Sequence, residues 1–400
     1  MLDIWPKFPV IIQDDGFPED LKAMEGVDNV IAALELNDRV SEIRLWAVSS
    51  PELKRLVAVM QDPFPALTKL WLESTEEIDE MAPVISDSFL GGSAPRLQFI
   101  QFCDIPFPAL PNLLLTATDL VDLRLFDIPH SGHISPGAMI ICLSTLTRLE
   151  SLILEFQSPR SRPDRASRLP PPLTRTILPA LTYLKFEGVT EYLEDLVTQI
   201  DVPLLEKIFM TFFNQLIFDI LHCHLHKFLC RTEEFTVFDR ACVSFYESSV
   251  DIELSSQPWI DDAPRVRLAI SCRMLDWQLS SLAQVCDSAL PTLSSLERLD
   301  ILDGTSDLVP GKDDIENTQW LDLLRPFTNI KDLHLYNQLI PYVAPALQEL
   351  TGTRITEVLP ALQNIFLHEV GASRPVEEGI VLFVAARHFS GHRVAIHHAK

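Results

Sequence analysis

The sequence predicts an α/β leucine-rich-repeat solenoid, an irregular right-handed α/β horseshoe with a parallel sheet on the concave side and helices on the convex side. Three segments point to it: Phe64–Leu72, Leu178–Phe186 and Leu359–Leu367. Each places an apolar residue before Pro-Ala and then follows the frame L-x-x-L-x-L, with Ile or Phe in some Leu positions. This frame is the strand signature of leucine-rich repeats, and it returns about every 29 residues, at the long end of their usual period.

The frame can be placed at twelve positions along the chain. Its central apolar residues are Ile43, Leu70, Ile100, Leu123, Leu152, Leu184, Ile208, Phe238, Leu268, Leu299, Leu333 and Ile365. The last two apolar residues of the frame are two apart, so both side chains point to one face of a strand. One strand cannot bury that face alone, and we therefore expect the repeats to stack around one continuous core.

Helical patterns follow the strands. After the first frame, Ser50 is expected to cap a helix, with Pro51 at its first position and Glu52 in its first turn. Apolar residues then recur three and four positions apart, which predicts helices with one buried face. Such stripes are Leu53, Leu56, Val57 and Met60; Leu193, Leu196, Val197 and Ile200; Leu275, Leu279, Leu282, Ala283 and Cys286; and Val343, Leu347 and Leu350. Strands that alternate with helices at this period predict a parallel sheet covered by helices on one side.

The pattern divides the chain into three parts. Residues 1–35 are expected to form an N-terminal capping segment with a short helix over Val27–Leu36, because the ends of a solenoid core need covering. Residues 36–370 are expected to form an array of about 10–12 irregular repeats. Residues 371–400 are expected to form a C-terminal helix and capping tail.

Two stretches interrupt the repeats. Between Phe235 and Ser256, apolar residues alternate with polar ones around Glu247-Ser248-Ser249, which predicts an extra β-hairpin. Ser158–Pro172 is rich in Arg and Pro and predicts a long polar insertion between the fifth and sixth strands. That insertion is either a basic docking loop or a solvated loop of an acidic protein.

The charge and the cysteines of the chain limit which partners it can bind and in which compartment it is expected. With 32 Lys and Arg against 56 Asp and Glu, the formal net charge is −24, which argues against a nucleic-acid partner. The first residues lack a signal-peptide pattern, and no apolar run approaches the roughly 20 residues of a membrane helix. The seven cysteines are scattered without a C-x-x-C pair, which indicates reduced thiols. We therefore expect a cytoplasmic or nuclear protein that binds neither membrane nor nucleic acid.

The polar clusters give no catalytic or metal-binding pattern. His222, His224 and His226 could ligate zinc, but their flanks predict a helix and no second ligand pair follows. Four histidines near the C-terminus are expected to lie in an exposed tail: His388, His392, His397 and His398. No nucleophile motif, phosphate-binding loop or metalloprotease motif is present, so we expect neither an enzyme nor a bound metal or cofactor.

The residue between the last two apolar positions of a frame points away from the core, onto the concave surface of the sheet. In the first seven frames these residues form a candidate protein-binding face: Arg44, Trp71, Gln101, Arg124, Ile153, Lys185 and Phe209. Later frames add Asp300, His334 and Phe366. Aromatic and Arg side chains dominate the binding energy of protein interfaces, which makes this face a candidate docking surface. The alternative is that inserted loops or tight curvature cover it.

Five short motifs are shared with a known family. They are Leu2-Asp3-Ile4-Trp5-Pro6, Phe213-Asn214-Gln215-Leu216, Arg231-Thr232-Glu233 with Phe235, Phe245-Tyr246, and Phe383-Val384-Ala385-Ala386-Arg387 with Ser390-Gly391-His392. Through them, nearly the whole chain resembles the F-box/leucine-rich-repeat proteins of mushroom-forming fungi. The resemblance implies a repeat arm that recruits a target protein to an SCF-type ubiquitin ligase, whose adaptor binds an N-terminal F-box.

The chain departs from that family in two ways. The resemblance begins at residue 1, at a segment that follows the F-box in relatives, so the F-box itself is expected to be missing. Regular repeats place Asn or Cys three positions after the frame, where this chain has Thr75, Ile105, Ile128 and Gln157. We expect a monomeric scaffold for an unidentified protein target, which binds the SCF adaptor only if an F-box precedes this sequence. The alternative is a stand-alone repeat module, or a truncated gene product, with no role in ubiquitin ligation.

Overall fold

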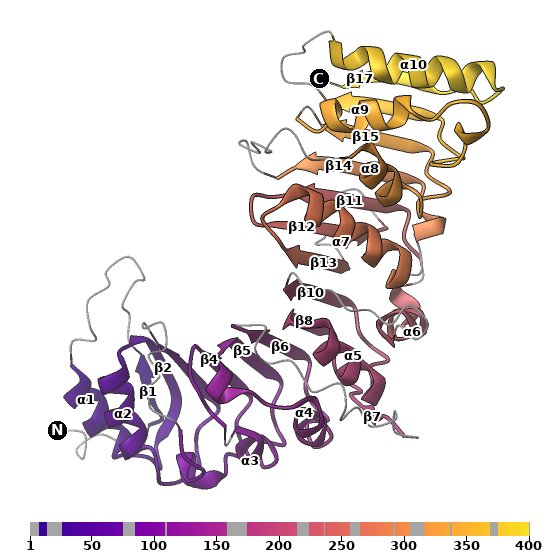
Figure 1. The fold of residues 1–400 in the computed structure, drawn as a ribbon. Helices are drawn as coiled ribbons and strands as arrows, with labels where there is room; N and C mark the ends of the chain where they lie inside the picture. The colour runs from indigo at the N-terminus through magenta and orange to yellow at the C-terminus, as the bar shows by residue number, and fades with distance from the viewer. Residues whose placement is uncertain are drawn as a thin grey trace. The chain divides into compact units, whose positions relative to one another are not determined.

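The computed structural model describes residues 8–13, 26–74, 85–108, 110–157, 174–213, 224–235, 237–256, 265–290, 293–304, 316–336, 338–368 and 375–399. The chain forms two compact units, Met1–Glu206 and Lys207–Lys400. The Arg- and Pro-rich stretch Ser158–Pro172 lies outside the described residues. In each unit, mostly parallel strands alternate with helices, and the helices cover one face of the sheet (Figure 1). The predicted α/β leucine-rich-repeat solenoid is thereby confirmed.

In the first unit, the strands of one parallel sheet follow the order of the chain. Its elements are β1 (Val10–Gln13), α1 (Val27–Leu34), β2 (Val40–Val48), α2 (Ser50–Val59), β3 (Lys69–Ser74), β4 (Phe99–Cys103), α3 (Leu110–Leu114), β5 (Asp122–Ile128), α4 (Pro136–Leu143), β6 (Ser151–Phe156), β7 (Thr176–Ile177), β8 (Tyr183–Gly188), α5 (Thr190–Gln199) and β9 (Ile200–Asp201). The sheet runs β1-β2-β3-β4-β5-β6-β8, with every neighbouring pair parallel. Strands β7 and β9 form a separate two-stranded ribbon.

The central apolar residues of the frames lie side by side across this sheet. Ile43 pairs with Leu70, and the same register continues through Ile100, Leu123, Leu152 and Leu184. Each of these side chains has 0% exposure. The predicted helix stripes of α2 and α5 are buried as well. The result is one continuous apolar layer between the sheet and its helices, which is how stacked repeats are stabilised.

Helix α2 begins one residue earlier than expected. Ser49 rather than Ser50 is its N-cap, because the N–H and Oγ of Ser49 donate to Glu52 Oε2 at 3.1 and 2.8 Å. Pro51 still lies in the first turn, where its missing N–H removes no helix hydrogen bond. Ser49 and Ser50 are both suitable N-cap residues. Ser49 is the N-cap because Glu52, three positions later, accepts its hydrogen bonds.

Left-handed residues turn the chain one position before the place where regular repeats use Asn. Ala47, Asp104 and Asp127 stand four positions after the centres of their frames and have φ of 51°, 56° and 47°. Residues other than Gly adopt this conformation infrequently, although Asp tolerates it well. At the next position, where regular repeats use Asn, this chain has the apolar residues Ile105 and Ile128, and both are buried.

The second unit contains an antiparallel interruption of the repeats. Its elements are β10 (Lys207–Phe213), α6 (His224–Arg231), β11 (Arg240–Phe245), β12 (Ser249–Ser255), β13 (Val266–Ser271), α7 (Leu275–Ser288), β14 (Arg298–Asp303), α8 (Asn317–Leu324), β15 (Asp332–Tyr336), α9 (Ile340–Gln348), β16 (Asn364–His368), α10 (Pro375–Phe389) and β17 (Ala395–Ala399). The sheet runs β10-β13-β12-β11-β14-β15-β16-β17. The predicted hairpin is confirmed as β11–β12, and β12 is also antiparallel to β13. The remaining neighbours are parallel.

Two of the assigned frames in this unit are wrong. Phe238 precedes β11, and the residue in register with Leu299 is Ala241, three positions later. Leu268 lies on β13, but Val266 is the residue in register with Ile208. At both places a smaller residue occupies the centre of the frame and a larger apolar residue stands two or three positions away, so the sequence pattern pointed to the larger one.

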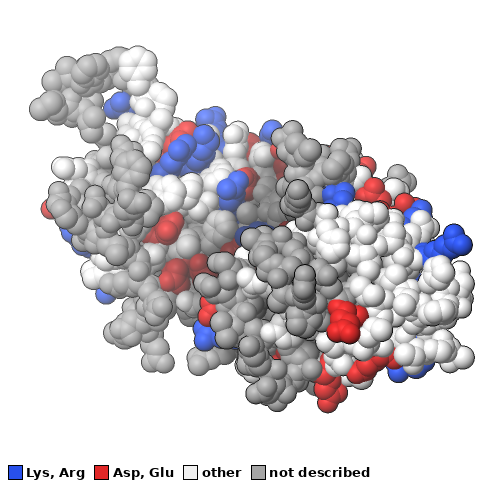
Figure 2. Space-filling view, turned by 90° about the horizontal axis from the view of Figure 1, so that it is seen from above, with Lys and Arg blue, Asp and Glu red and all other residues white. Residues whose placement is uncertain are grey.

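Residues expected to form an exposed tail include the outermost strand of the sheet. Strand β17 pairs in parallel with β16, and Ile396 is in register with Ile365. Helix α10 packs closely on α9, because a Cβ on Gly379 would lie only 3.3 Å from the carbonyl oxygen of Ala344. Seen from above, the surface over α10 is mostly free of Lys, Arg, Asp and Glu (Figure 2). No helix within the described residues has the length and apolar character to cross a membrane.

Arg387 fastens α10 to the turn that precedes β16. Its guanidinium is buried and donates from Nη2 to the carbonyl oxygens of Val358 and Leu359, both at 2.8 Å. The ring of Phe383 lies 5.2 Å from the cation. Because burial disfavours the charged form, the pKa of Arg387 is lowered to about 10. Both residues lie in the short motif Phe383–Arg387, and the structure gives them a packing role.

We expect Leu184→Ala to lower the free energy of unfolding by about 2–5 kcal/mol, because it leaves a cavity in the central row of the first unit. Urea unfolding followed by circular dichroism measures this change. Leu204→Ala is the matched control, since Leu204 is exposed and should cost less than about 0.5 kcal/mol. A loss equally small for Leu184→Ala would contradict the assignment of the row.

Candidate functional site

The face of each sheet that its helices leave uncovered is called the outer face below. In the first unit, the residues in register across it, the outer row, are Arg44, Trp71, Gln101, Arg124, Ile153 and Lys185. They come from β2, β3, β4, β5, β6 and β8 and bring six of the seven candidate residues together. Phe209, the seventh, belongs to the second unit, where it is in register with Arg267.

Two members of the outer row are not accessible to a partner, contrary to expectation. Gln101 is 5% exposed and Ile153 is 7% exposed. Gln101 lies between Trp71 and Arg124 in the register, and Ile153 lies between Arg124 and Lys185. Each of these two shorter side chains thus stands between two longer ones in the register. The accessible part of the row is therefore made of its aromatic and cationic members.

The cations of the outer row are already paired with carboxylates of the same face. The pairs are Arg44–Glu42 at 2.8 Å, Arg124–Asp122 at 2.7 Å and Lys185–Glu155 at 2.6 Å. Asp122 accepts hydrogen bonds from both Nε and Nη2 of Arg124, which raises the pKa of the guanidinium. About a third of each cationic side chain remains exposed, so the pairs add little stability. Their effect is to hold the side chains in place.

Three rings and one guanidinium form an aromatic cluster in the outer face of the first unit. The ring centroids of Trp46 and Trp71 are 3.9 Å apart, and those of Trp71 and Phe99 are 6.2 Å apart. The guanidinium carbon of Arg124 lies 5.3 Å from the centroid of Phe99. All four side chains are partly exposed. Trp and Arg are the residue types most enriched at the energetic centres of protein interfaces.

Carboxylates gather beside the cluster, toward the carboxyl ends of the strands. Burial raises the pKa of Glu73, and the charge of Asp127 adds to that shift. Burial also raises the pKa of Glu187, together with the nearby Glu155. The same causes, burial first and then the acidic neighbours, raise the pKa of the Cys103 thiol to about 12. This edge is therefore negatively charged and its thiol is a poor nucleophile.

The outer face of the second unit carries a corresponding row. In register it runs through Phe209, Arg267, Glu253, Cys242, Asp300, His334, Phe366 and His397. The later candidates from the sequence, Asp300, His334 and Phe366, are thus direct neighbours.

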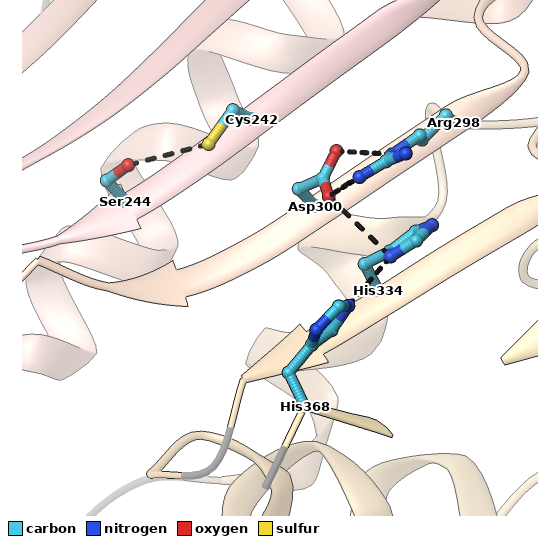
Figure 3. A network of polar contacts seen from close by, with 6 residues as sticks. All are labelled: Cys242, Ser244, Arg298, Asp300, His334 and His368. Atoms are coloured by element: carbon cyan, nitrogen blue, oxygen red, sulfur yellow. Dashed lines mark hydrogen bonds and ion pairs between the residues drawn. The ribbon is translucent and has the colours of Figure 1, made fainter. Parts of the chain in front are cut away.

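A polar network joins three strands of this face (Figure 3). Arg298 donates from Nε and Nη2 to the two oxygens of Asp300 at 2.9 and 2.7 Å. His334 Nδ1 lies 3.9 Å from Asp300 and 2.9 Å from His368 Nε2. Only the second distance is that of a hydrogen bond, so the two imidazoles are bonded to each other, one as donor and one as acceptor.

The environment keeps both imidazoles neutral. Burial lowers the pKa of His334 to about 4, and the positive charge of Arg298 works in the same direction against the attraction of Asp300. Burial also lowers the pKa of His368. Neutral rings suit the bond between them, since an imidazolium has no nitrogen left to accept a hydrogen bond.

Flat rings stack along the same strands. His334 lies on Phe366 with centroids 4.3 Å apart and planes at 10°, and Phe366 lies on His397 at 4.7 Å and 18°. One row further, Tyr336 lies on His368 at 4.2 Å and 6°. This end of the outer face is therefore a surface of fixed, closely stacked rings.

Among the described residues on and beside this network, no side chain is an activated nucleophile. Burial raises the pKa of Cys242 to about 12, and its Sγ lies 3.7 Å from Ser244 Oγ. Figure 3 shows these two residues turned toward each other on β11, apart from the imidazole pair. In the part of the chain that the structure describes, no three His, Cys, Asp or Glu residues are arranged to hold a metal ion. Of the histidine cluster weighed for zinc, His224 and His226 lie on α6, and His222 is outside the described residues.

Sequence reasoning missed several residues of the outer face. Trp46, Phe99, Tyr336 and His368 belong to it, although none is the residue between the last two apolar positions of a frame. A usable signal was present, because side chains two positions apart share one face of a strand. Trp46 stands two positions after Arg44, and Tyr336 two positions after His334. The acid–base pairs Glu42–Arg44, Asp122–Arg124 and Arg298–Asp300 have the same spacing.

Comparison with known proteins identifies no family. No protein-family model matches the chain, and no curated protein matches it. Among solved structures, it is similar to the crystal structure of the leucine-rich repeat-containing protein LegL7 from Legionella pneumophila, at 12% identity, over 93% of this chain and 97% of that chain, with a TM-score of 0.30. A likeness this distant supports no inference, so the fold rests on the strand topology and register.

We expect mild acid to destabilise the second unit through His334. The pKa of His334 is about 4 in the folded protein against an ordinary 6.5, so below about pH 6.5 the unfolded chain binds a proton that the folded chain does not. Stability then falls as the pH falls, by about 1 kcal/mol between about pH 7 and about pH 5.5. Urea unfolding at both pH values measures it. His334→Gln should reduce this dependence, because only the smaller contribution of His368 then remains, and His392→Gln, at an exposed site, should keep it in full. The same dependence in all three proteins would exclude His334 as its source.

Proposed function

We propose that the chain is a protein-interaction scaffold and that the outer face of its first unit is the docking surface for a target protein. One observation carries the proposal. The aromatic cluster of Trp46, Trp71 and Phe99, with Arg124 stacked on it, stays partly exposed on a face that no described helix covers. Contiguous apolar surface that remains open to solvent marks contact sites on soluble proteins.

The paired cations indicate how a target binds. Arg44, Arg124 and Lys185 are each held by a carboxylate, so an incoming acidic group gains little from them. The same pairing fixes the side chains beforehand, which reduces the conformational entropy lost on binding. The target is therefore expected to place an apolar or aromatic anchor against Trp71 and to make its polar contacts around that anchor.

The finer proposal is that this scaffold recruits its target to an SCF-type ubiquitin ligase. Its support is the resemblance to F-box/leucine-rich-repeat proteins. Two of the shared motifs are structural in this chain, since Phe245 is a core residue of β11 and Arg387 fastens α10. The resemblance is thus one of architecture, and the link to the ligase depends on an F-box outside these 400 residues. The alternative is a stand-alone module that uses the same outer face without an adaptor.

Trp71→Ala combined with Arg124→Ala should weaken target binding at least about tenfold and leave the fold intact, because both side chains lie on the surface of the sheet. The target is isolated by affinity capture on the wild-type chain, and its affinity for each protein is then measured by calorimetry. Trp277→Ala with Arg273→Ala is the matched control, since it removes an exposed Trp and Arg from the second unit. Equal affinity of the Trp71/Arg124 variant, with normal unfolding, would place the docking surface elsewhere.

The 400-residue chain alone should not form a stable complex with the purified SCF adaptor, because the adaptor binds the F-box in the family that the chain resembles. Biolayer interferometry measures the affinity, with a chain extended upstream through an in-frame F-box as the positive control. A sub-micromolar complex with the 400-residue chain would show that it contains an adaptor-binding segment of its own. No complex even with the extended chain would favour the stand-alone module.

A further inference from the structure

The C-terminal end of the second unit presents an uncovered apolar helix face. On α10, Val381, Leu382 and Phe389 are 51%, 47% and 90% exposed. They lie away from Ile380 and Phe383, which are buried on the inner side of the same helix. Leu382 and Phe389 are seven positions apart, about two turns, so they belong to one stripe. A helix that is apolar on both sides is expected to be covered on both sides.

The sheet is open at this same end. Strand β17 is its outermost strand, and Ile396 remains partly exposed although its register neighbours Ile365 and Leu333 have 0% exposure. The N–H of Ala395 donates to the carbonyl of Gln363, beside β16. Because the ladder alternates along a parallel strand, the backbone groups of Ile396 and His398 then point away from β16. Such an open edge is a template for another strand.

The ring stack of the outer face also ends at this edge. His397 is the last ring of the series His334, Phe366 and His397. It stacks on Phe366 by one face, and in the described part of the chain no ring lies on its other face. Helix, strand and ring stack thus all stop at the same boundary of the unit.

We propose that a second copy of this chain covers this boundary, with α10 against α10 and β17 against β17 around a two-fold axis. A two-fold axis makes both pairs antiparallel and self-complementary. A register centred on His397 sets Ile396 opposite His398, so that their outward backbone groups bond each other. It also brings the two His397 rings face to face across the axis. This proposal differs from the monomer expected from the sequence.

Charge along α10 favours a second copy over an unrelated partner. Exposed Glu378 lies near the start of the helix, and exposed Arg393 lies just beyond its end. Antiparallel packing brings the acidic start of α10 in one copy to the basic end of α10 in the other. This happens at both ends of the apolar stripe. A chain with a formal net charge of −24 repels its own copies in most orientations, so this local complementarity selects one of them.

Sedimentation velocity of the purified chain tests the helix contact. The wild-type chain should form a dimer at micromolar concentration. Val381→Glu with Leu382→Glu should make it monomeric, because the substitutions bring four carboxylates into an apolar contact. Ile177→Glu with Leu204→Glu is the matched control, since it adds the same charge at apolar residues of the first unit that are 60% and 58% exposed, and it should remain dimeric. Circular dichroism checks that each variant is folded.

A second pair of variants tests the strand contact. His398→Pro removes one outward N–H and should weaken the dimer at least about tenfold, whereas His398→Ala keeps that N–H and should not. A wild-type chain that stays monomeric overturns the proposal, and so does a dimer that persists unchanged in the α10 variant or in His398→Pro. Growth into open-ended assemblies overturns it too, because that would show head-to-tail pairing instead of a two-fold axis.

Discussion

No repeat of this chain can bury its apolar face alone, and the rest of the structure depends on that constraint. The central residue of each frame has no exposure because the next strand places another apolar residue in register beside it. The register also fixes the opposite face. Once Ile43 and Leu70 are aligned in the core, Arg44 and Trp71 must be aligned on the outside. The core and the candidate docking surface are therefore two sides of one arrangement.

The sequence was sufficient wherever a repeat carries large residues at the expected spacing. The frames around Leu70, Leu123 and Leu152 were found from the L-x-x-L-x-L pattern alone, since bulky residues two apart identify the buried side of a strand. The sequence pattern failed at Ala241 and Val266, because the central residue there is smaller than a nearby apolar residue. Only the register shows which residue is central. Strand β17 was missed for a related reason, as no leucine precedes Ile396 at the frame spacing.

The candidate site was less predictable than the fold, because its properties arise between strands. The outer row could be named from the frame, but the burial of Gln101 between Trp71 and Arg124 appears only when the strands are placed side by side. The bond between His334 and His368 joins residues 34 positions apart, and only the register sets them next to each other. Ion pairs within one strand, such as Glu42 with Arg44, could have been predicted from the sequence, because residues two positions apart share one face of a strand.

In the second unit, the order of synthesis differs from the order of docking. In a regular solenoid each new strand can dock on the one made before it, whereas here β10 pairs with β13, and β11 and β12 lie between them in the chain. A nascent chain must therefore hold one edge of β10 vacant until Val266–Ser271 has left the ribosome. Pairing over such a separation is slow, and an unpaired strand edge invites aggregation in the meantime. The hairpin that interrupts the repeats thus creates an interval of translation in which one edge of β10 is left unpaired.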